Sequence, residues 1–324
     1  MTNPIIRFVK NWTLPIAMIA GALLYFAAAR VPVLASNRDL LLGAISIIQP
    51  VLIFAMLFIT FCKVDPHTLH IRSWQGWLLL VQILGFSLLS SLLILFPHMR
   101  GRVIVEGAML CLVCPTATAG AVITHKLGGD ASGLTAYTIL VNLAVAIIVP
   151  VFVPLVNPHP DLDFSLSFFM IMGKVFPMLI CPFFAAMLVR QFFPRLQAKI
   201  SSYRDLAFNI WAVSLALAIA VTTRSIVHAN IGLGELAGIA VASLVCCIAQ
   251  FALGRRIGSL YNCPIAAGQS LGQKNTVFAI WMGYTFLTPV SAIAGGFYSL
   301  WHNAFNSWQL YQQRNRQVPD KPKA

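Results

Sequence analysis

Long apolar runs dominate this chain of 324 residues and restrict its possible folds. A helix that crosses a bilayer needs about 20 mainly apolar residues, and ten segments of the chain meet that requirement. These segments are Leu14–Ala29, Leu42–Cys62, Gly76–Phe96, Val103–Lys126, Ser132–Leu155, Met170–Phe192, Leu206–Val221, Leu233–Leu253, Pro264–Leu287 and Pro289–Leu310. Only 10% of the residues are charged, which is too few to cover a water-soluble fold. The sequence therefore predicts an all-α polytopic membrane protein with ten transmembrane helices, embedded in a lipid bilayer.

Basic residues are distributed unevenly between the two sides of these spans. Most lysines and arginines lie in the N-terminal segment and in the loops on its side, including Arg190, Arg195, Lys199 and Arg204. Because positively charged loops stay in the cytoplasm, we expect a protein of the cell membrane with both termini cytoplasmic. The formal net charge of +13 thus follows from membrane topology, and we expect no nucleic-acid partner.

The expected spans divide into two sets of five near the loop Pro158-His159-Pro160. An odd number of spans per half means that the second half enters the membrane upside down relative to the first. This is the arrangement of inverted repeats in secondary transporters. We expect the repeats to occupy residues 1–160 and 161–311, followed by a polar cytoplasmic tail over residues 312–324.

The fourth and ninth expected spans carry helix-breaking and polar residues at mid-depth. In the fourth span, Pro115 removes a backbone hydrogen-bond donor among small and hydroxylated residues. In the ninth, two glycines and several polar residues interrupt the apolar run. Because interrupted helices at matching positions of two halves indicate a binding site, we expect breaks at Pro115–Gly120 and Gly268–Asn275. We also expect the two broken spans to cross near the membrane midplane.

Two charged residues within the expected spans have different interpretations. Lys274 lies at mid-membrane, where a lysine costs at least about 2.5 kcal/mol, and this cost indicates a functional role. Glu106 follows Arg102 by four residues, which predicts an i,i+4 ion pair. The seven cysteines show no metal-ligand spacing and no disulfide framework, so we expect buried free thiols and neither a metal nor a cofactor.

At the two predicted breaks the sequence resembles the bile acid:sodium symporter family, as a divergent bacterial-type member, and the resemblance covers the whole ten-span plan. Family members carry Pro-Gly-Gly-Thr-Ala-Ser-Asn in the fourth span, which Pro115, Thr118 and Ala119 match in register. They carry Glu-x-Gly-x-Gln-Asn in the ninth span, where Gly272 and Asn275 are identical. The resemblance implies that spans 3–5 and 8–10 form a core domain, and that spans 1, 2, 6 and 7 form a panel that moves against it.

The residues that hold two sodium ions in the family are largely replaced in this sequence. Gly120-Ala121 stands at the family's Ser-Asn pair, Ser270 at its glutamate and Lys274 at its glutamine. The loss of the carboxylate and the gain of an ammonium indicate that Lys274 takes the place of one sodium ion. The ion-coupling candidates are Lys274, Ser270, Gln82 and Thr138, the last two by resemblance to a third-span glutamine and a fifth-span hydroxyl. The alternative is a sodium site rebuilt from Gln82, Ser270, Gln273 and backbone carbonyls.

We expect a secondary active transporter of an organic anion, either a bile acid or another amphipathic carboxylate, that works by alternating access. Half-helix N-termini after the two breaks attract anions, and the lysine adds a full positive charge. The substrate-binding candidates are Thr116, Thr118, Gly120, Thr124, Gln273, Lys274, Asn275 and Thr276. A channel needs a continuous polar pore and an enzyme needs a catalytic set, so a carrier is favoured over both. The sequence leaves open the substrate, the direction of transport, the oligomeric state, and the choice between sodium coupling, proton coupling and uniport.

Overall fold

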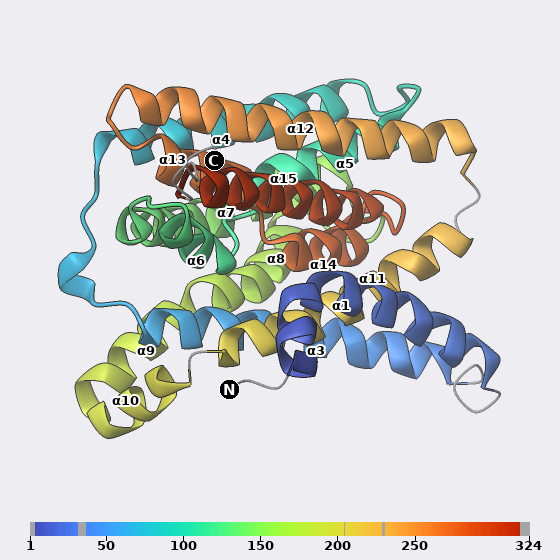
Figure 1. The fold of residues 1–324 in the computed structure, drawn as a ribbon. Coiled ribbons are helices and arrows are strands. Elements are labelled where there is room, and N and C mark those ends of the chain that lie inside the picture. Colours follow the sequence, from blue (N-terminus) through green and yellow to red (C-terminus); the bar gives the residue numbers. More distant parts are fainter. Residues whose placement is uncertain (1–3, 32–36, 204, 229–230, 318–324) are drawn as a thin grey trace, which may run out of the picture.

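The protein is helical almost throughout, as Figure 1 shows for the computed structural model. The structure describes residues 4–31, 37–203, 205–228 and 231–317. Within these ranges, extended pairing is confined to one isolated bridge between Thr116 and Lys274. The predicted all-α class is therefore confirmed.

The helices follow the expected spans closely along the chain. The first half forms α1 (Pro4–Arg30), α3 (Arg38–Cys62), η1 (Pro66–Thr68), α4 (Ser73–Leu95), α5 (Arg102–Val113), α6 (Ala119–Lys126) and α7 (Ala131–Val156). The second half forms α8 (Phe164–Leu179), α9 (Cys181–Phe192), α10 (Pro194–Ser202), α11 (Leu206–His228), α12 (Leu233–Ser259), α13 (Pro264–Gly272), α14 (Thr276–Phe286) and α15 (Ile293–Gln317).

Six helices in the described part of the chain are long and apolar enough to cross a membrane. They are α3 from Leu40 onward, α4, α7, the α8–α9 pair, α11 and α12. Shorter apolar stretches lie in α1 (Pro15–Arg30) and in α14, and α15 carries many polar residues. These helices are those of a multi-pass membrane protein, whereas ten crossings and an inverted repeat stay predictions.

Several helices begin or end away from the expected boundaries, as α1 does by beginning at Pro4 rather than Leu14 and α11 by ending at His228 rather than Val221. α8 begins at Phe164 rather than Met170, because the Asp163 carboxylate accepts a hydrogen bond from the Leu166 amide at 2.9 Å and so caps the helix. α15 continues to residue 317, so residues 312–317 of the expected tail are helical. Residues 318–324 of that tail lie outside the described residues.

Packing groups most of the helices into two sets. In the first set, α1 packs on α11, α11 on α3, and α3 on α9. In the second, α12 packs on α13, α5 and α15, while α4 packs on α5 and α7. The two sets meet where α8 packs on both α7 and α3, and where α14 packs on α3 and α11.

Glycines allow α12 to pack very closely on α13. A Cβ atom added to Gly254 or to Gly258 would come within 2.6 Å of Ala267. Gly254 and Gly258 are four residues apart, as are Gly268 and Gly272 of α13, and this spacing is typical of closely packed membrane helices. The prediction that the second break starts at Gly268 is therefore wrong, because the glycines of α13 continue the helix.

Arg102 fastens the start of α5 to neighbouring helices. Its Nε donates to Glu106 Oε1 at 2.8 Å, which confirms the predicted ion pair. The other guanidinium nitrogens donate to the carbonyl oxygens of Leu93, Pro97 and Val156. The ends of α4 and α7 are thus held against α5 by one side chain.

Candidate functional site

The first interruption separates α5 from α6 at residues 114–118. Cys114 has φ −53° and ψ 135°, the extended conformation that a following proline favours. Pro115 has no N–H and so is unable to continue the hydrogen bonds of the helix. α6 then starts at Ala119, which corrects the predicted extent of the break, because Gly120 lies in the first turn of α6.

The second interruption separates α13 from α14 at residues 273–275. Gln273 is extended, with φ −92° and ψ 101°. Asn275 Oδ1 accepts a hydrogen bond from the Phe278 amide at 3.2 Å, which caps the N-terminus of α14. This break contains no proline, so a side-chain cap rather than a missing donor defines its end.

The two interruptions pair with each other through their backbones. The Ala117 amide donates to the Gln273 carbonyl at 2.9 Å, and the Asn275 amide donates to the Pro115 carbonyl at 2.8 Å. Backbone groups left free by the broken helices therefore satisfy one another. This pairing confirms that the fourth and ninth segments are discontinuous and that they meet at their breaks.

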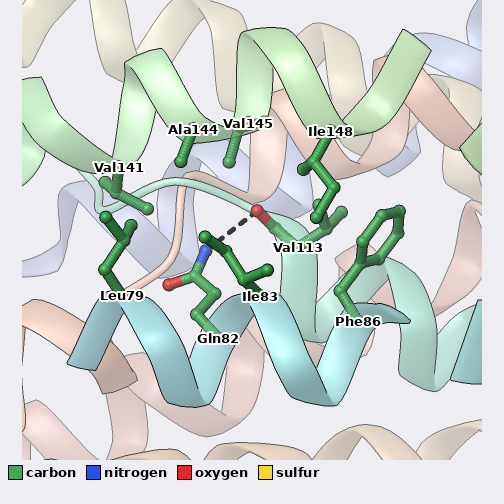
Figure 2. A pocket seen from close by; sticks show the side chains of 9 residues that line it. All are labelled: Leu79, Gln82, Ile83, Phe86, Val113, Val141, Ala144, Val145 and Ile148. Atoms are coloured by element: carbon green, nitrogen blue, oxygen red, sulfur yellow. Dashed lines mark hydrogen bonds between the residues drawn. The ribbon is translucent and has the colours of Figure 1, made fainter. Parts of the chain in front are cut away.

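Gln82 of α4 binds the C-terminal end of α5, as Figure 2 shows. Its Nε2 donates to the carbonyl oxygens of Val113 at 3.0 Å and Cys114 at 3.1 Å. Tyr137 donates its hydroxyl hydrogen to Gln82 Oε1 at 3.1 Å. These partners fix the orientation of the amide, because the nitrogen faces two acceptors and the oxygen faces a donor. The other side chains around Gln82 in Figure 2 are apolar: Leu79, Ile83, Phe86, Val113, Val141, Ala144, Val145 and Ile148.

Lys274 occupies a cation site made of neutral oxygens. Only 1% of the residue is exposed, and its ammonium donates to Gln82 Oε1 at 2.8 Å and to the Leu112 carbonyl at 3.3 Å. Leu112 lies in the last turn of α5, where terminal carbonyls carry partial negative charge. Among the described side chains, Lys274 forms no ion pair. Within the described residues, no carboxylate therefore balances its positive charge.

A cavity of about 790 Å³ reaches the paired interruptions, and Gln273 and Lys274 line it. α1 and α11 supply an apolar wall made of Pro15, Met18, Ile19, Phe208 and Trp211. α6 and α15 supply the facing wall, together with Ala117. Among the described residues, the lining includes two lysines, Lys126 and Lys274, and no acidic residue. The volume lies within the range of small-molecule sites.

The structure brings only part of the predicted substrate site to the cavity. Of the eight candidates, Gln273 and Lys274 line it, whereas Thr116, Thr118, Gly120, Thr124, Asn275 and Thr276 do not. Thr116 Oγ1 instead donates to the Ser270 carbonyl at 2.6 Å, and Asn275 caps α14. These two side chains therefore stabilise the crossing of the two interrupted helices and do not line the cavity.

The ion-coupling candidates have different surroundings. Gln82 and Lys274 bind each other directly. Thr138 Oγ1 donates to the carbonyl oxygen four residues earlier in its own helix at 3.0 Å. Ser270 Oγ is buried without a hydrogen-bond partner, and so is Gln273 Oε1.

A polar face of α15 lines the cavity and was not found from the sequence. His302, Asn303, Asn306 and Ser307 belong to this face. Asn306 also accepts a hydrogen bond from Gln269 Nε2 of α13 at 3.0 Å, which joins α15 to the helix before the second interruption. The signal was present in the tenth span, because Ser299, His302, Asn306 and Gln309 recur at the spacing of one helix face.

The fold and the site are those of a helical membrane protein in which two interrupted helices pair beside a cavity. The chain belongs to the sodium bile acid symporter family, which it matches over residues 50–232, more than half of its length. The matched range contains the first interruption and ends before the second. At the level of the family, the protein is a membrane transporter rather than an enzyme. None of the curated proteins matches the chain.

Proposed function

We propose that the protein is a secondary active transporter that carries an organic anion by alternating access. The observation that carries this proposal is the position of Lys274, whose ammonium is buried at the paired interruptions and which is one of the residues that line the cavity, where the described lining has no acidic side chain. The N-termini of α6 and α14 begin at the two interruptions and add partial positive charge there. A carboxylate in the cavity is attracted to this region, whereas a cation is repelled.

The walls of the cavity belong to two groups of helices whose relative movement would open and close it. α1 and α11 belong to a proposed panel of α1, α3, α8, α9 and α11, and α6 and α15 belong to a proposed core of the remaining membrane helices. The two interruptions lie in different halves of the chain, as inverted repeats over residues 1–160 and 161–311 would place them. We propose that the cavity opens to the cytoplasm, because Lys126 on its wall belongs to the positively charged side of the protein.

Lys274 is proposed to replace a sodium ion. Its ammonium is bound by a side-chain amide oxygen and a backbone carbonyl oxygen, and neutral oxygens of this kind also suit a small hard cation. A positive charge fixed to the chain removes the need for sodium at this position. Transport is therefore proposed to be independent of sodium.

We propose that protonation of Lys274 couples substrate binding to proton binding. A bound carboxylate stabilises the ammonium form, so substrate binding and protonation favour each other. If the proton leaves on the other side of the membrane, the protein is a proton symporter. If the ammonium stays charged throughout the cycle, the protein is a uniporter or an exchanger.

Charge selectivity is tested by ligand binding to the purified full-length protein. We expect cholate, below the concentration at which it forms micelles, to raise the midpoint of thermal unfolding, and its uncharged methyl ester to have a much smaller effect. Lys274→Gln should abolish the difference between acid and ester, whereas Lys126→Gln, on the cavity wall, should retain most of it. Equal stabilisation by acid and ester would contradict the electrostatic argument, and a screen of other carboxylates with their esters extends the test beyond bile acids.

Ion coupling is tested with liposomes and a labelled carboxylate that passes the binding test. We expect counterflow of labelled substrate, which distinguishes a carrier from a channel, and uptake that does not respond to a sodium gradient. A proton gradient separates symport from uniport. If a sodium gradient stimulates uptake only in Lys274→Gln, the result supports the proposal that Lys274 replaces a sodium ion. Strong stimulation of uptake by the unmutated protein would refute that proposal.

A sodium-coupled symporter is the second candidate, and two atoms favour it. Ser270 Oγ and Gln273 Oε1 are buried without partners, and unpartnered oxygens near an interrupted helix are suitable sodium ligands. In that case sodium chloride should stabilise the protein against heat more than choline chloride does. The difference should disappear in Ser270→Ala.

A further inference from the structure

α10 is a short helix at the edge of the molecule, near the lower left of Figure 1. It packs on α9 and on the end of α3. Gln197 Nε2 donates to the Cys62 carbonyl at 2.6 Å, and Ser201 Oγ donates to the same oxygen at 3.1 Å. One face of α10 is thus attached to the C-terminal end of α3, whose last carbonyls need donors.

The other face of α10 is basic and exposed. Arg195 and Lys199 lie one helical turn apart, and both are exposed. Leu196 on α10 is 47% exposed, and Phe192 and Phe193 at the end of α9 are 67% and 61% exposed. Apolar side chains beside lysine and arginine are typical of helices that lie in the membrane interface.

The basic side chains on this face are not part of the ion pairs that the described residues form. Residues 190–204 include four basic residues and no acidic one. Arg190, before α10, pairs with Asp65 at 3.5 Å. In the part of the chain that the structure describes, neither Arg195 nor Lys199 forms an ion pair. The exposed face of α10 therefore complements a negative charge supplied from outside the chain.

We propose that Arg195 and Lys199 bind the phosphate headgroup of an anionic phospholipid, while Phe192, Phe193 and Leu196 insert among its acyl chains. Lipid phosphates are the negative groups found at the depth of an interfacial helix, and the apolar side chains distinguish a lipid from free phosphate. Because α10 connects α9 with α11, the bound lipid anchors these two helices at the membrane surface. This proposal does not depend on the identity of the transported substrate.

Photocrosslinking in membranes tests the proposal directly. The full-length protein is reconstituted with trace amounts of a photoreactive phosphatidylglycerol or of the matching phosphatidylcholine, with the photoreactive group near the headgroup. We expect phosphatidylglycerol to label the peptide that contains residues 192–203, and phosphatidylcholine to label it much less. Arg195→Gln with Lys199→Gln should reduce this labelling roughly tenfold, because each basic residue near an anionic surface adds substantially to lipid binding.

Arg256→Gln provides the matched control, because Arg256 is an exposed basic residue at the end of α12. Its labelling in residues 192–203 should equal that of the unmutated protein. Because Gln197 and Ser201, and not the substituted side chains, bind α10 to α3, we expect the double variant to fold. An unchanged midpoint of thermal unfolding will show this. Equal labelling by the two lipids, or labelling that survives the double substitution, would overturn the proposal.

Discussion

At the scale of single residues, Gln82 organises the first interruption. Its amide donates to Val113 and Cys114 and accepts from Tyr137 and Lys274, so each of its polar atoms has two partners. A buried amide with complete bonding is rigid, whereas a buried group without partners is costly. The position of the Lys274 ammonium is therefore determined by a residue from a different helix.

A double-mutant cycle on Gln82 and Lys274 tests this coupling. Gln82→Leu removes the closer acceptor of the buried ammonium, the acceptor of the Tyr137 hydroxyl and the donor to two carbonyls, so we expect a loss of at least about 3 kcal/mol in the free energy of unfolding. Lys274→Met should remove most of that penalty, so the double variant should lose less than the sum of the single variants. Equilibrium unfolding in mixed micelles gives the free energy of unfolding of the unmutated protein, the two single variants and the double variant. Strictly additive losses would show that the two side chains do not act together.

At the scale of elements, the two interruptions have different causes. Pro115 ends α5 through its own covalent structure, and the break follows from one residue. The second break is formed by pairing with Pro115 and Ala117 and by the Asn275 cap. The glycines before it pack α13 against α12 instead of breaking the helix.

Gly254→Ala tests the packing of α12 on α13. The added Cβ atom would meet the backbone oxygen of Ala267 at 2.6 Å, so the helices must separate, and we expect a loss of about 1–3 kcal/mol. Gly173→Ala in α8 is the matched control, since an added Cβ meets nothing within 4 Å there. Thermal unfolding of both variants in the same detergent gives the comparison. If the two alanine variants prove equally stable, close glycine packing does not hold α12 to α13.

At the scale of the whole molecule, the cavity lies between helices that are far apart in the sequence. Its apolar wall comes from α1 and α11, its polar wall from α15, and its lysines from α6 and the second interruption. The proposed substrate, an amphipathic carboxylate, would contact both kinds of wall. Membrane orientation then decides which compartment the cavity faces.

Cysteine labelling measures that orientation. Ser307 is exposed on the cavity wall, and the lining contains no native cysteine. In Ser307→Cys we expect a membrane-impermeant maleimide to react in inside-out vesicles and not in right-side-out vesicles. Ser243→Cys, at a fully buried position of α12, should react in neither. Labelling confined to right-side-out vesicles would reverse the proposed topology.

The membrane class, the approximate helices and the break at Pro115 follow from the sequence alone, and the sequence also indicated Lys274 as a candidate site residue. These features depend on local chemistry: apolar length, a missing backbone donor and the cost of a buried charge. The family resemblance also indicated Gln82, which the structure places against the lysine ammonium.

Which polar residues face the cavity depends on how the helices pack in three dimensions. Thr116 and Asn275 lie at the crossing but bind backbone groups, whereas His302 and Ser307 of α15 line the cavity wall. The limits of the second break also depend on pairing with a segment more than 150 residues earlier in the chain. Helix rotation and long-range backbone pairing are set by packing between distant segments, so the order of residues within one segment does not specify them.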